Sequence, residues 1–241
     1  MVGTFIVLEG GEGCGKSTQA RTLYSSLLRE GYPSLLLHEP GSTPLGDQIR
    51  RLLKAQRGDG QRKRQDRQQA PITPLAELLL FSAARADLVS NALRPALDEG
   101  RVVVCDRYTP STIAYQGYGR GVPLETVHQV NRLTSAGVEP DLVVLLDMPP
   151  EDSLRRVAAQ VSMPLDAEVT PDTRRSDEEG QRRFEEEPLC FHRKVRSGYL
   201  ELAKADTEQW LVVDGTLPKE RIAGIIWQRV ESLVRVHTQQ W

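Results

Sequence analysis

The stretch Phe5–Thr18, FIVLEGGEGCGKST, decides the fold. It begins with four apolar residues, continues through a glycine-rich loop and ends where an amphipathic helical pattern starts. The loop Gly10–Ser17 matches the pattern G-x-x-x-x-G-K-[ST], which holds the phosphates of a nucleoside triphosphate when it joins a buried strand to a helix. The sequence therefore predicts a phosphate-binding loop (P-loop) for ATP at this point of the chain.

Each part of the P-loop has a physical task. Its glycines permit positive φ angles and let backbone N–H groups surround phosphate oxygens. The helix that begins near Lys16 directs the positive end of its dipole at the same anion. Lys16 supplies a point charge, and Ser17 offers a hydroxyl to Mg²⁺. The predicted ATP-binding residues are Gly10, Gly11, Glu12, Gly13, Cys14, Gly15, Lys16, Ser17 and Thr18.

Five short apolar runs alternate with helical patterns along the chain. Continuous rather than alternating hydrophobicity is typical of parallel strands that are buried on both faces. The alternation predicts a doubly wound α/β fold, in which a five-stranded parallel sheet carries helices on both faces. The runs are Phe5–Leu8, Leu35–Leu37, Val102–Cys105, Leu142–Leu146 and Leu211–Val213. The helical patterns cover residues 16–30, 44–54, 75–98, 123–137, 149–159, 186–206 and 218–236.

Two segments interrupt this pattern, and we expect residues 1–241 to form a single P-loop domain around them. Residues 56–70 are rich in Gln and charge and have no aliphatic periodicity, which predicts a variable, solvated insertion. Residues from about 161 to 183 mix Pro, Asp, Thr and Arg between two helices. In a nucleotide enzyme such a segment can serve as a lid that closes over the substrates.

Composition narrows the possible classes of function. The formal net charge is −2, which argues against a dedicated nucleic-acid or membrane-surface binder. The three cysteines are widely spaced, without metal-ligand spacing, as expected for a reduced protein of the cytoplasm. We see no signal-peptide pattern and no apolar stretch long enough to span a bilayer.

The dipeptide Asp106–Arg107 follows the third apolar run, where open α/β sheets bind ligands at the carboxyl ends of their strands. Asp106 could order magnesium-bound water or orient Arg107, and Arg107 could clamp a substrate phosphate with two hydrogen bonds. The alternative is a structural ion pair. Glu12 also has two interpretations, since a carboxylate beside a triphosphate must face either solvent or a neutral group such as a sugar hydroxyl.

On the preceding helical pattern, Glu77, Phe81 and Arg85 are spaced by four and share one face. Phe81 offers a flat surface, and Arg85 offers donors one turn away, which suits a planar base with carbonyl acceptors. A core position is the alternative for Phe81. A GTPase is excluded because the chain lacks N-K-x-D, the nearest string being Ala203–Asp206.

These motifs resemble those of the bacterial thymidylate kinase family over nearly the whole chain. The most specific is Tyr115-Gln-Gly-x-x-Arg-Gly121 after Asp106-Arg-Tyr108. Other carriers of the resemblance are Glu39-Pro-Gly41, Gly46-x-x-Ile-Arg50, Glu77-x-x-x-Phe81-x-x-x-Arg85, Arg94-Pro-Ala-Leu97, Pro140-Asp-Leu142 and Phe191-His-x-x-Val195-x-x-Gly198-Tyr199.

The resemblance implies a homodimer that transfers a phosphoryl group from ATP, with Mg²⁺, to dTMP. It implies that Phe81 stacks on thymine, that Arg85, Ser111 and Gln116 bond the edge of the base, and that Arg50 and Arg107 hold the phosphate. Glu12 then approaches the sugar 3′-hydroxyl, and Glu39 and Asp106 shape the acceptor and metal sites. The implied catalytic residues are Lys16, Arg107 and Glu12, and the implied metal-site residues are Ser17 and Asp106.

The chain departs from the family pattern at several points. His38 stands where the family commonly has Arg, and Pro110 where Asp is frequent. Arg156, Arg174, Arg175, Arg182 and Arg183 are all candidates for the lid arginine. Two other functions stay open, namely a nucleoside or nucleotide kinase for another base and a non-catalytic P-loop switch.

Overall fold

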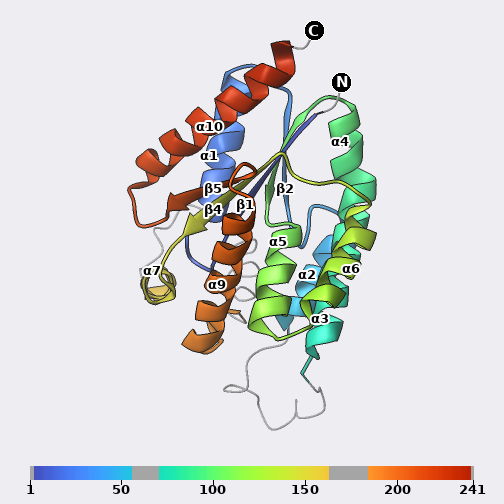
Figure 1. Cartoon of the computed structure of the whole chain (residues 1–241), viewed down its shortest axis with the longest axis vertical. Coiled ribbons are helices and arrows are strands. Elements are labelled where there is room, and N and C mark those ends of the chain that lie inside the picture. The colour runs from blue at the N-terminus through green and yellow to red at the C-terminus, as the bar shows by residue number, and fades with distance from the viewer. Residues whose placement is uncertain (1–2, 56–70, 163–183, 240–241) are drawn as a thin grey trace.

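The computed structural model describes residues 3–55, 71–162 and 184–239, which form a parallel sheet covered by helices on both faces (Figure 1). The strands are β1 (Thr4–Gly10), β2 (Ser34–His38), β3 (Val102–Asp106), β4 (Leu142–Asp147) and β5 (Trp210–Asp214). The α-helices are α1 (Lys16–Arg29), α2 (Pro44–Ala55), α3 (Pro74–Leu88), α4 (Arg94–Asp98), α5 (Thr109–Thr112), α6 (Leu124–Ser135), α7 (Pro150–Ser162), α9 (Leu189–Ala205) and α10 (Lys219–Gln239). Two π-helical segments are η1 (Val89–Leu93) and η2 (Ile113–Gly119).

The sheet order is β2-β3-β1-β4-β5, and every pairing is parallel. The chain passes from β1 to β2 on one side of the sheet and later from β3 across to β4 on the other side. The order therefore reverses beside β1, and a crevice opens there at the carboxyl ends of β1 and β3. The register pairs Leu8 with Asp106, so the P-loop and the Asp106–Arg107 dipeptide leave neighbouring strands side by side.

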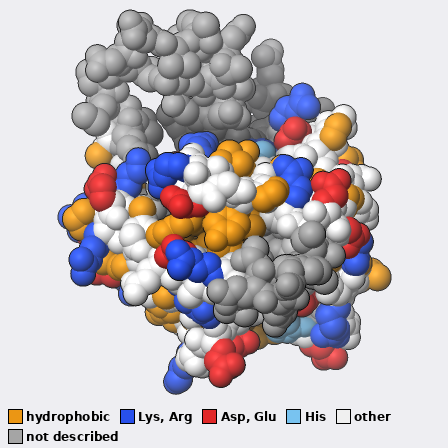
Figure 2. Space-filling view, turned by 90° about the horizontal axis from the view of Figure 1, so that it is seen from above, with side chains coloured by type: hydrophobic (Ala, Val, Ile, Leu, Met, Phe, Trp, Pro, Cys, Tyr) orange, Lys and Arg blue, Asp and Glu red, His pale blue; other side chains and the backbone are white. Residues whose placement is uncertain are grey.

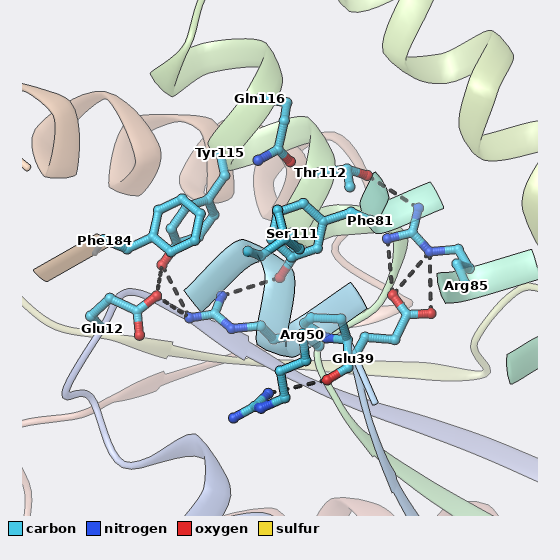
Figure 3. A pocket seen from close by; sticks show the side chains of 13 residues that line it. Glu12, Glu39, Arg50, Phe81, Arg85, Ser111, Thr112, Tyr115, Gln116 and Phe184 are labelled. Carbon is cyan, nitrogen blue, oxygen red and sulfur yellow. Dashed lines mark hydrogen bonds and ion pairs between the residues drawn. The ribbon is translucent and has the colours of Figure 1, made fainter. Parts of the chain in front are cut away.

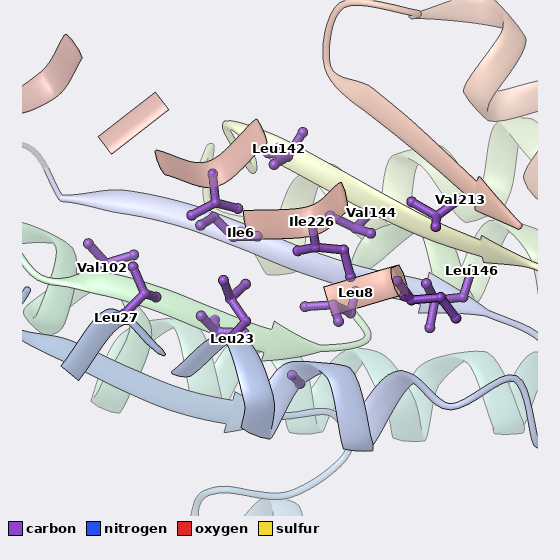
Figure 4. Packing of buried hydrophobic residues seen from close by; sticks show 14 of the residues in the cluster. Ile6, Leu8, Leu23, Leu27, Val102, Leu142, Val144, Leu146, Val213 and Ile226 are labelled. Carbon is purple, nitrogen blue, oxygen red and sulfur yellow. The ribbon is translucent and has the colours of Figure 1, made fainter. Parts of the chain in front are cut away.

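Strand β1 is buried along its whole length because both of its faces are covered. Ile6 and Leu8 pack on one face with Leu23 of α1 and Ile226 of α10, as Figure 4 shows. The alternate residues pack on the other face against η1 and α4. Two covered faces require apolar residues in succession, which is the pattern that predicted the parallel sheet. The predicted fold class is confirmed.

The helices differ from the sequence prediction in two places. The single helix expected over residues 75–98 is divided into α3, η1 and α4, and it begins after Thr73, whose hydroxyl accepts from the N–H of Ala76 over 3.3 Å. The pair α5 and η2, residues 109–119, was not predicted. Gly117 and Gly119 lower its helix propensity, and tertiary packing stabilises it, since a Cβ at Gly119 would lie 2.6 Å from the ring of Phe191 in α9.

The predicted insertion 56–70 lies outside the described residues, as does the predicted lid segment except for residues 161–162, which end α7. No helix among residues 3–55, 71–162 and 184–239 combines the length and apolar character needed to cross a membrane. Acidic and basic side chains are interspersed on the face of the molecule in Figure 2, as a formal net charge of −2 would suggest.

Candidate active site

The P-loop has the backbone that its glycines predict, with one exception. Gly10, Gly13 and Gly15 have φ angles of 143°, 72° and 96°, whereas Gly11 has no positive φ. A Cβ at Gly13 would lie 2.6 Å from the carbonyl oxygen of Ser153, but a Cβ at Gly11 would meet no atom within 4 Å. The expectation of a positive φ at Gly11 is therefore wrong, and only three of the four glycines need their conformational freedom.

The side chain of Lys16 folds back over the loop. Its ammonium donates to the carbonyl oxygen of Gly11 over 2.6 Å and lies 3.7 Å from the sulfur of Cys14. Cys14 is buried and belongs to the core cluster beneath β1, so its side chain fills space below the loop. Lys16 is buried, and its ammonium is held by the concave loop, where its charge can meet a phosphate.

Ser17 and Asp106 meet beside the P-loop. The Ser17 hydroxyl donates to Oδ2 of Asp106, and the other carboxylate oxygen, Oδ1, is buried without a hydrogen-bond partner. A buried carboxylate oxygen without a partner is costly, which fits a bound cation or a water that a cation holds. In the described part of the chain no three His, Cys, Asp or Glu side chains gather at one point. That is compatible with Mg²⁺, which commonly takes one or two protein ligands together with substrate phosphates.

Arg107 occupies a cage of polar groups. Its φ is 76°, a left-handed conformation that is rare for a residue with a side chain. Nη1 donates to the carbonyl oxygen of Gly10, to Oγ of Ser111 and to the hydroxyl of Tyr199, over 3.2–3.3 Å. Nη2 donates to Oε1 of Glu12 over 2.6 Å and to the hydroxyl of Tyr115 over 3.1 Å. Arg107 is therefore held from several sides and does not pair with Asp106, which faces Ser17.

Glu12 faces this cage and not solvent. Burial acts to raise the pKa of its carboxyl, but the charges of Arg107 and Lys16 outweigh burial and lower the pKa to about 2. The Tyr115 hydroxyl also donates to Oε1 of Glu12 over 2.8 Å. The carboxylate of Glu12 is thus ionised, and the positive charges of Arg107 and Lys16 compensate its negative charge before any phosphate binds.

A cavity of about 110 Å³ opens between α2, α3, η2 and the P-loop. Phe81 and Phe184 face it from different elements, with ring centroids 6.2 Å apart and planes inclined by 46°. Figure 3 shows Glu12 and Tyr115 at one end of this space and Arg85 with Glu39 at the other. The lining residues are Glu12, Glu39, Pro40, Arg50, Leu53, Phe81, Arg85, Arg107, Ser111, Thr112, Tyr115, Gln116 and Phe184.

Phe81 satisfies both interpretations that the sequence left open. It packs beside the small cluster of Ile49, Leu53 and Ala84, and it also lines the cavity. Part of the side chain therefore stabilises the contact between α2 and α3. The remaining surface is available to a planar ligand.

Arg85 lines the cavity and is fully engaged with protein groups. Nε and Nη2 each lie 3.0 Å from Oε2 of Glu39, and Nη2 also donates to the carbonyl oxygen of Tyr108 over 3.2 Å. Nη1 donates to Oδ1 of Asn131 over 2.7 Å and to the Thr112 hydroxyl over 3.3 Å. The long contact with Thr112 is the weakest of these bonds and the one most easily shared with a ligand.

The other predicted contacts to the base and phosphate also line the cavity. Gln116 donates through Nε2 to Oε1 of Glu77 over 2.8 Å. Arg50 donates to the carbonyl oxygen of Pro40 over 3.1 Å. Burial raises the pKa of Glu39 to about 7, although the guanidinium of Arg85 acts in the opposite direction.

Of the predicted lid arginines, only Arg156 falls within the described residues. It lies on α7, where its guanidinium donates to the carbonyl oxygens of Gly215 and Thr216 over 2.9 and 3.4 Å. It does not line the cavity. Arg174, Arg175, Arg182 and Arg183 lie outside the described residues.

Sequence reasoning assigned no role to several residues of the site, among them Glu9, Tyr115, Phe184 and Tyr199. Both tyrosines lie in motifs that carried the family resemblance, so the motifs contained the signal although no role was inferred from it. Glu9 directly precedes the P-loop, but nothing in the sequence says that its carboxylate is buried. Phe184 follows a charged segment and carries no local pattern.

Comparison with known proteins agrees with this geometry. The family model described as thymidylate kinase matches residues 8–226. A thymidylate kinase of Dehalococcoides mccartyi is 43% identical over 230 residues, which cover 95% of this chain and 96% of that protein. One from Synechococcus sp. is 42% identical over 97% of both chains.

A solved structure has the same fold. The crystal structure of thymidylate kinase from Ehrlichia chaffeensis superposes with a TM-score of 0.66 at 26% identity, covering 97% of this chain and 99% of that one. A P-loop, an aromatic-walled cavity beside it, a full-length family match and relatives above 40% identity together place the chain in the thymidylate kinase family.

Proposed function

We propose that the chain converts dTMP to dTDP by transferring the γ-phosphoryl group of ATP on the P-loop to dTMP in the cavity between Phe81 and Arg107, with release of ADP. The conversion of dTMP to dTDP is the activity of its family. The observation that supports the assignment of sites is the continuity of the cavity, which extends from the ring of Phe81 to Glu12 inside the P-loop. An acceptor that lies on Phe81 therefore has its phosphate end near the donor.

The acceptor base lies against Phe81, and Phe184 borders the same space. Arg85 and Gln116 carry N–H donors at the wall of this space, which suits the carbonyl oxygens of thymine. Ser111 is better suited to Arg107 than to a base carbonyl, because its single proton is donated to Glu9 over 2.7 Å. Glu39 holds Arg85 in place through their ion pair, and Glu12 accepts a hydrogen bond from the sugar hydroxyl.

Arg50 and Arg107 hold the acceptor phosphate. Both line the cavity, and Arg107 has its guanidinium at the end nearest the P-loop. The attacking oxygen belongs to a phosphate whose second pKa is about 6, so it is largely ionised at neutral pH and needs no strong base. Catalysis consists of alignment and charge stabilisation by Lys16 and Arg107, with Glu12 holding Arg107 in place.

Ser17 and Asp106 are the residues that would hold Mg²⁺. The hydroxyl of Ser17 and the partnerless Oδ1 of Asp106 provide oxygen ligands next to the P-loop. The metal would shield the negative charges of the ATP phosphates. Lid arginines remain part of the proposal, with Arg156, Arg174, Arg175, Arg182 and Arg183 as candidates.

The helices α2 and α3 pack against each other, and the exposed leucines that they carry support a homodimer. Leu45, Leu52, Leu75 and Leu79 are each between 45% and 50% exposed. A second copy of the chain is the occupant that matches the family resemblance. We expect Leu52→Glu with Leu79→Glu to shift the sedimentation coefficient to that of a monomer, whereas Leu28→Glu on α1 leaves it unchanged. A monomeric unmodified protein at micromolar concentration contradicts the proposal.

The three free cysteines, Cys14, Cys105 and Cys190, support a reducing compartment such as the cytoplasm. The single-domain organisation over residues 1–241 is likewise part of the proposal.

A panel of nucleoside monophosphates tests the substrate. With ATP and Mg²⁺ in excess, kcat/KM measured from ADP release is expected to be highest for dTMP, lower for dUMP and poor for purine monophosphates. A better purine substrate favours a kinase for another base. ADP release that does not depend on any monophosphate favours a P-loop switch.

A further inference from the structure

A buried carboxylate lies directly behind Arg107, and the mechanism above does not use it. Glu9 near the end of β1 is completely buried and does not line the cavity. Its Oε1 accepts from the backbone N–H of Tyr108 over 2.9 Å. Its Oε2 accepts from the hydroxyls of Ser111 and Tyr199, each over 2.7 Å.

The same two hydroxyl oxygens also accept from Arg107. Nη1 of Arg107 lies 3.2 Å from Oγ of Ser111 and 3.3 Å from the hydroxyl oxygen of Tyr199. A hydroxyl has one proton to donate and two lone pairs to accept with.

The two hydroxyls lie 3.0 Å from each other, and both lie within donating distance of Oε2 of Glu9. When both protons are directed to Glu9, the lone pairs of both hydroxyls are directed to the guanidinium. Burial raises the pKa of Glu9, while the charge of Arg107 and the hydrogen bonds from Ser111, Tyr199 and Tyr108 act to lower it. In its ionised form Glu9 sets the direction of both contacts.

Glu9 also supports the backbone of Arg107. A residue with a side chain is strained at a φ of 76°, so surrounding contacts must hold it there. The N–H of Arg107 donates to the carbonyl oxygen of Leu8 over 3.0 Å, and the next N–H, of Tyr108, donates to Glu9. The turn that directs Arg107 toward the P-loop is therefore fastened to β1 on both sides.

We propose that Glu9 is a positioning residue for Arg107 and fixes both its backbone turn and the orientation of its guanidinium. The proposal rests on the function assigned above to Arg107 at the acceptor phosphate. Glu12 acts differently, because it meets Arg107 directly on the cavity side. Glu9 acts through two hydroxyls from behind, where no substrate reaches.

Glu9→Gln tests this with almost no change of shape. In this variant the amide N–H groups of the new side chain would face the two hydroxyl oxygens. The hydroxyl protons then turn toward Arg107, and the hydroxyls no longer accept hydrogen bonds from its guanidinium. We expect the dissociation constant for dTMP, measured by calorimetry, to rise on the order of tenfold. We expect kcat to fall while the KM for ATP stays within twofold of the unmodified value. Glu201→Gln, on the exposed side of α9, is the matched control and should change neither.

A double-mutant cycle separates positioning from a general loss of structure. On the Arg107→Ala background, Glu9→Gln should weaken dTMP binding no further, because the group that it positions is absent. An undiminished loss on that background, or equal rises in KM for ATP and dTMP, overturns the inference. If Arg107→Ala itself binds dTMP normally, the proposed function of Arg107 fails instead.

Tyr199→Phe provides a milder variant in case Glu9→Gln does not fold. It removes one of the two relayed contacts, and we expect a loss of dTMP affinity of about threefold. Tyr199→Phe combined with Ser111→Ala should approach the loss seen with Arg107→Ala. Unchanged dTMP affinity in that combined variant also overturns the inference.

Discussion

Nη2 of Arg107 lies 2.6 Å from Oε1 of Glu12, and both side chains line the acceptor cavity. The pair explains how a carboxylate is tolerated inside a P-loop. The charges of Arg107 and Lys16 lower the pKa of Glu12 to about 2 despite its burial, so the carboxylate stays ionised and its charge is compensated. Under the proposed function, Glu12 offers an oxygen to the sugar hydroxyl while it helps hold Arg107.

Lys16→Ala and Arg107→Ala are each expected to lower kcat/KM for dTMP by about a hundredfold or more, because each removes a charge that the proposed function places at the phosphate oxygens. The steady-state rate of ADP formation checks this. Lys194→Ala and Arg132→Ala, at exposed positions, are the matched controls. Near-normal activity in either site variant, with a normal melting temperature, contradicts the assigned role.

Gly13→Ala is expected to destabilise the protein by at least about 2 kcal/mol, because its φ of 72° is strained for Ala and the new Cβ would lie 2.6 Å from Ser153. Gly11→Ala is the control within the same loop, since no atom lies within 4 Å of its Cβ position. Calorimetric melting of both variants without ligand provides the comparison. Equal melting temperatures contradict the prediction.

Phe81→Leu keeps an apolar side chain toward Ile49 but removes the flat surface that faces the cavity. We expect the KM for dTMP to rise about tenfold, the scale of a lost stacking contact with a base. The KM for ATP should not change. A rise in both KM values, accompanied by a lower melting temperature, would indicate that Phe81 acts only in the core.

The buried pair of Glu39 and Arg85 predicts a pH dependence of stability. Burial raises the pKa of Glu39 from its ordinary value of 4.5 to about 7, so the folded protein binds this proton more tightly than the unfolded chain does. The contribution of Glu39 to the free energy of unfolding is full below pH about 4.5 and declines by at most about 3 kcal/mol as the pH rises to about 7.

Glu39→Gln cannot titrate and should lack this decline. Denaturant unfolding at intervals between pH 4.5 and 7.5 measures the difference between the two proteins. If the free energy of unfolding changes with pH in the same way in both proteins, Glu39 stays ionised throughout. The charge of Arg85 then has a larger effect on the pKa of Glu39 than burial does.

Asp106→Asn is expected to raise the Mg²⁺ concentration needed for half-maximal activity about tenfold, because an amide replaces the carboxylate that the proposed function assigns to the metal site. It should not lower the melting temperature, since Oδ1 has no protein partner to lose. A magnesium titration at fixed ATP checks the first expectation. If Asp106→Asn needs the same Mg²⁺ concentration as the unmodified protein, the metal binds away from Asp106.

Local sequence was sufficient for much of this protein. The apolar runs predicted every strand of the sheet, because a strand covered on both faces must be apolar throughout. The P-loop could be read residue by residue, since its chemistry depends on a contiguous stretch of backbone. Helical spacing pointed to Phe81 and Arg85 and the end of a predicted strand to Arg107, and the structure places all three around one cavity.

Only the tertiary structure decided which groups face one another. Glu9 and Tyr199 are separated by 190 positions in the sequence, yet they share a hydrogen bond behind Arg107. The helical pair α5 and η2 has weak local propensity and is stabilised by packing on α9. Sequence determined the strands, most of the helices and the P-loop because these depend on neighbouring residues. The cage around Arg107 depends on contacts between distant strands and helices, and burial and hydrogen-bond direction exist only once those contacts form.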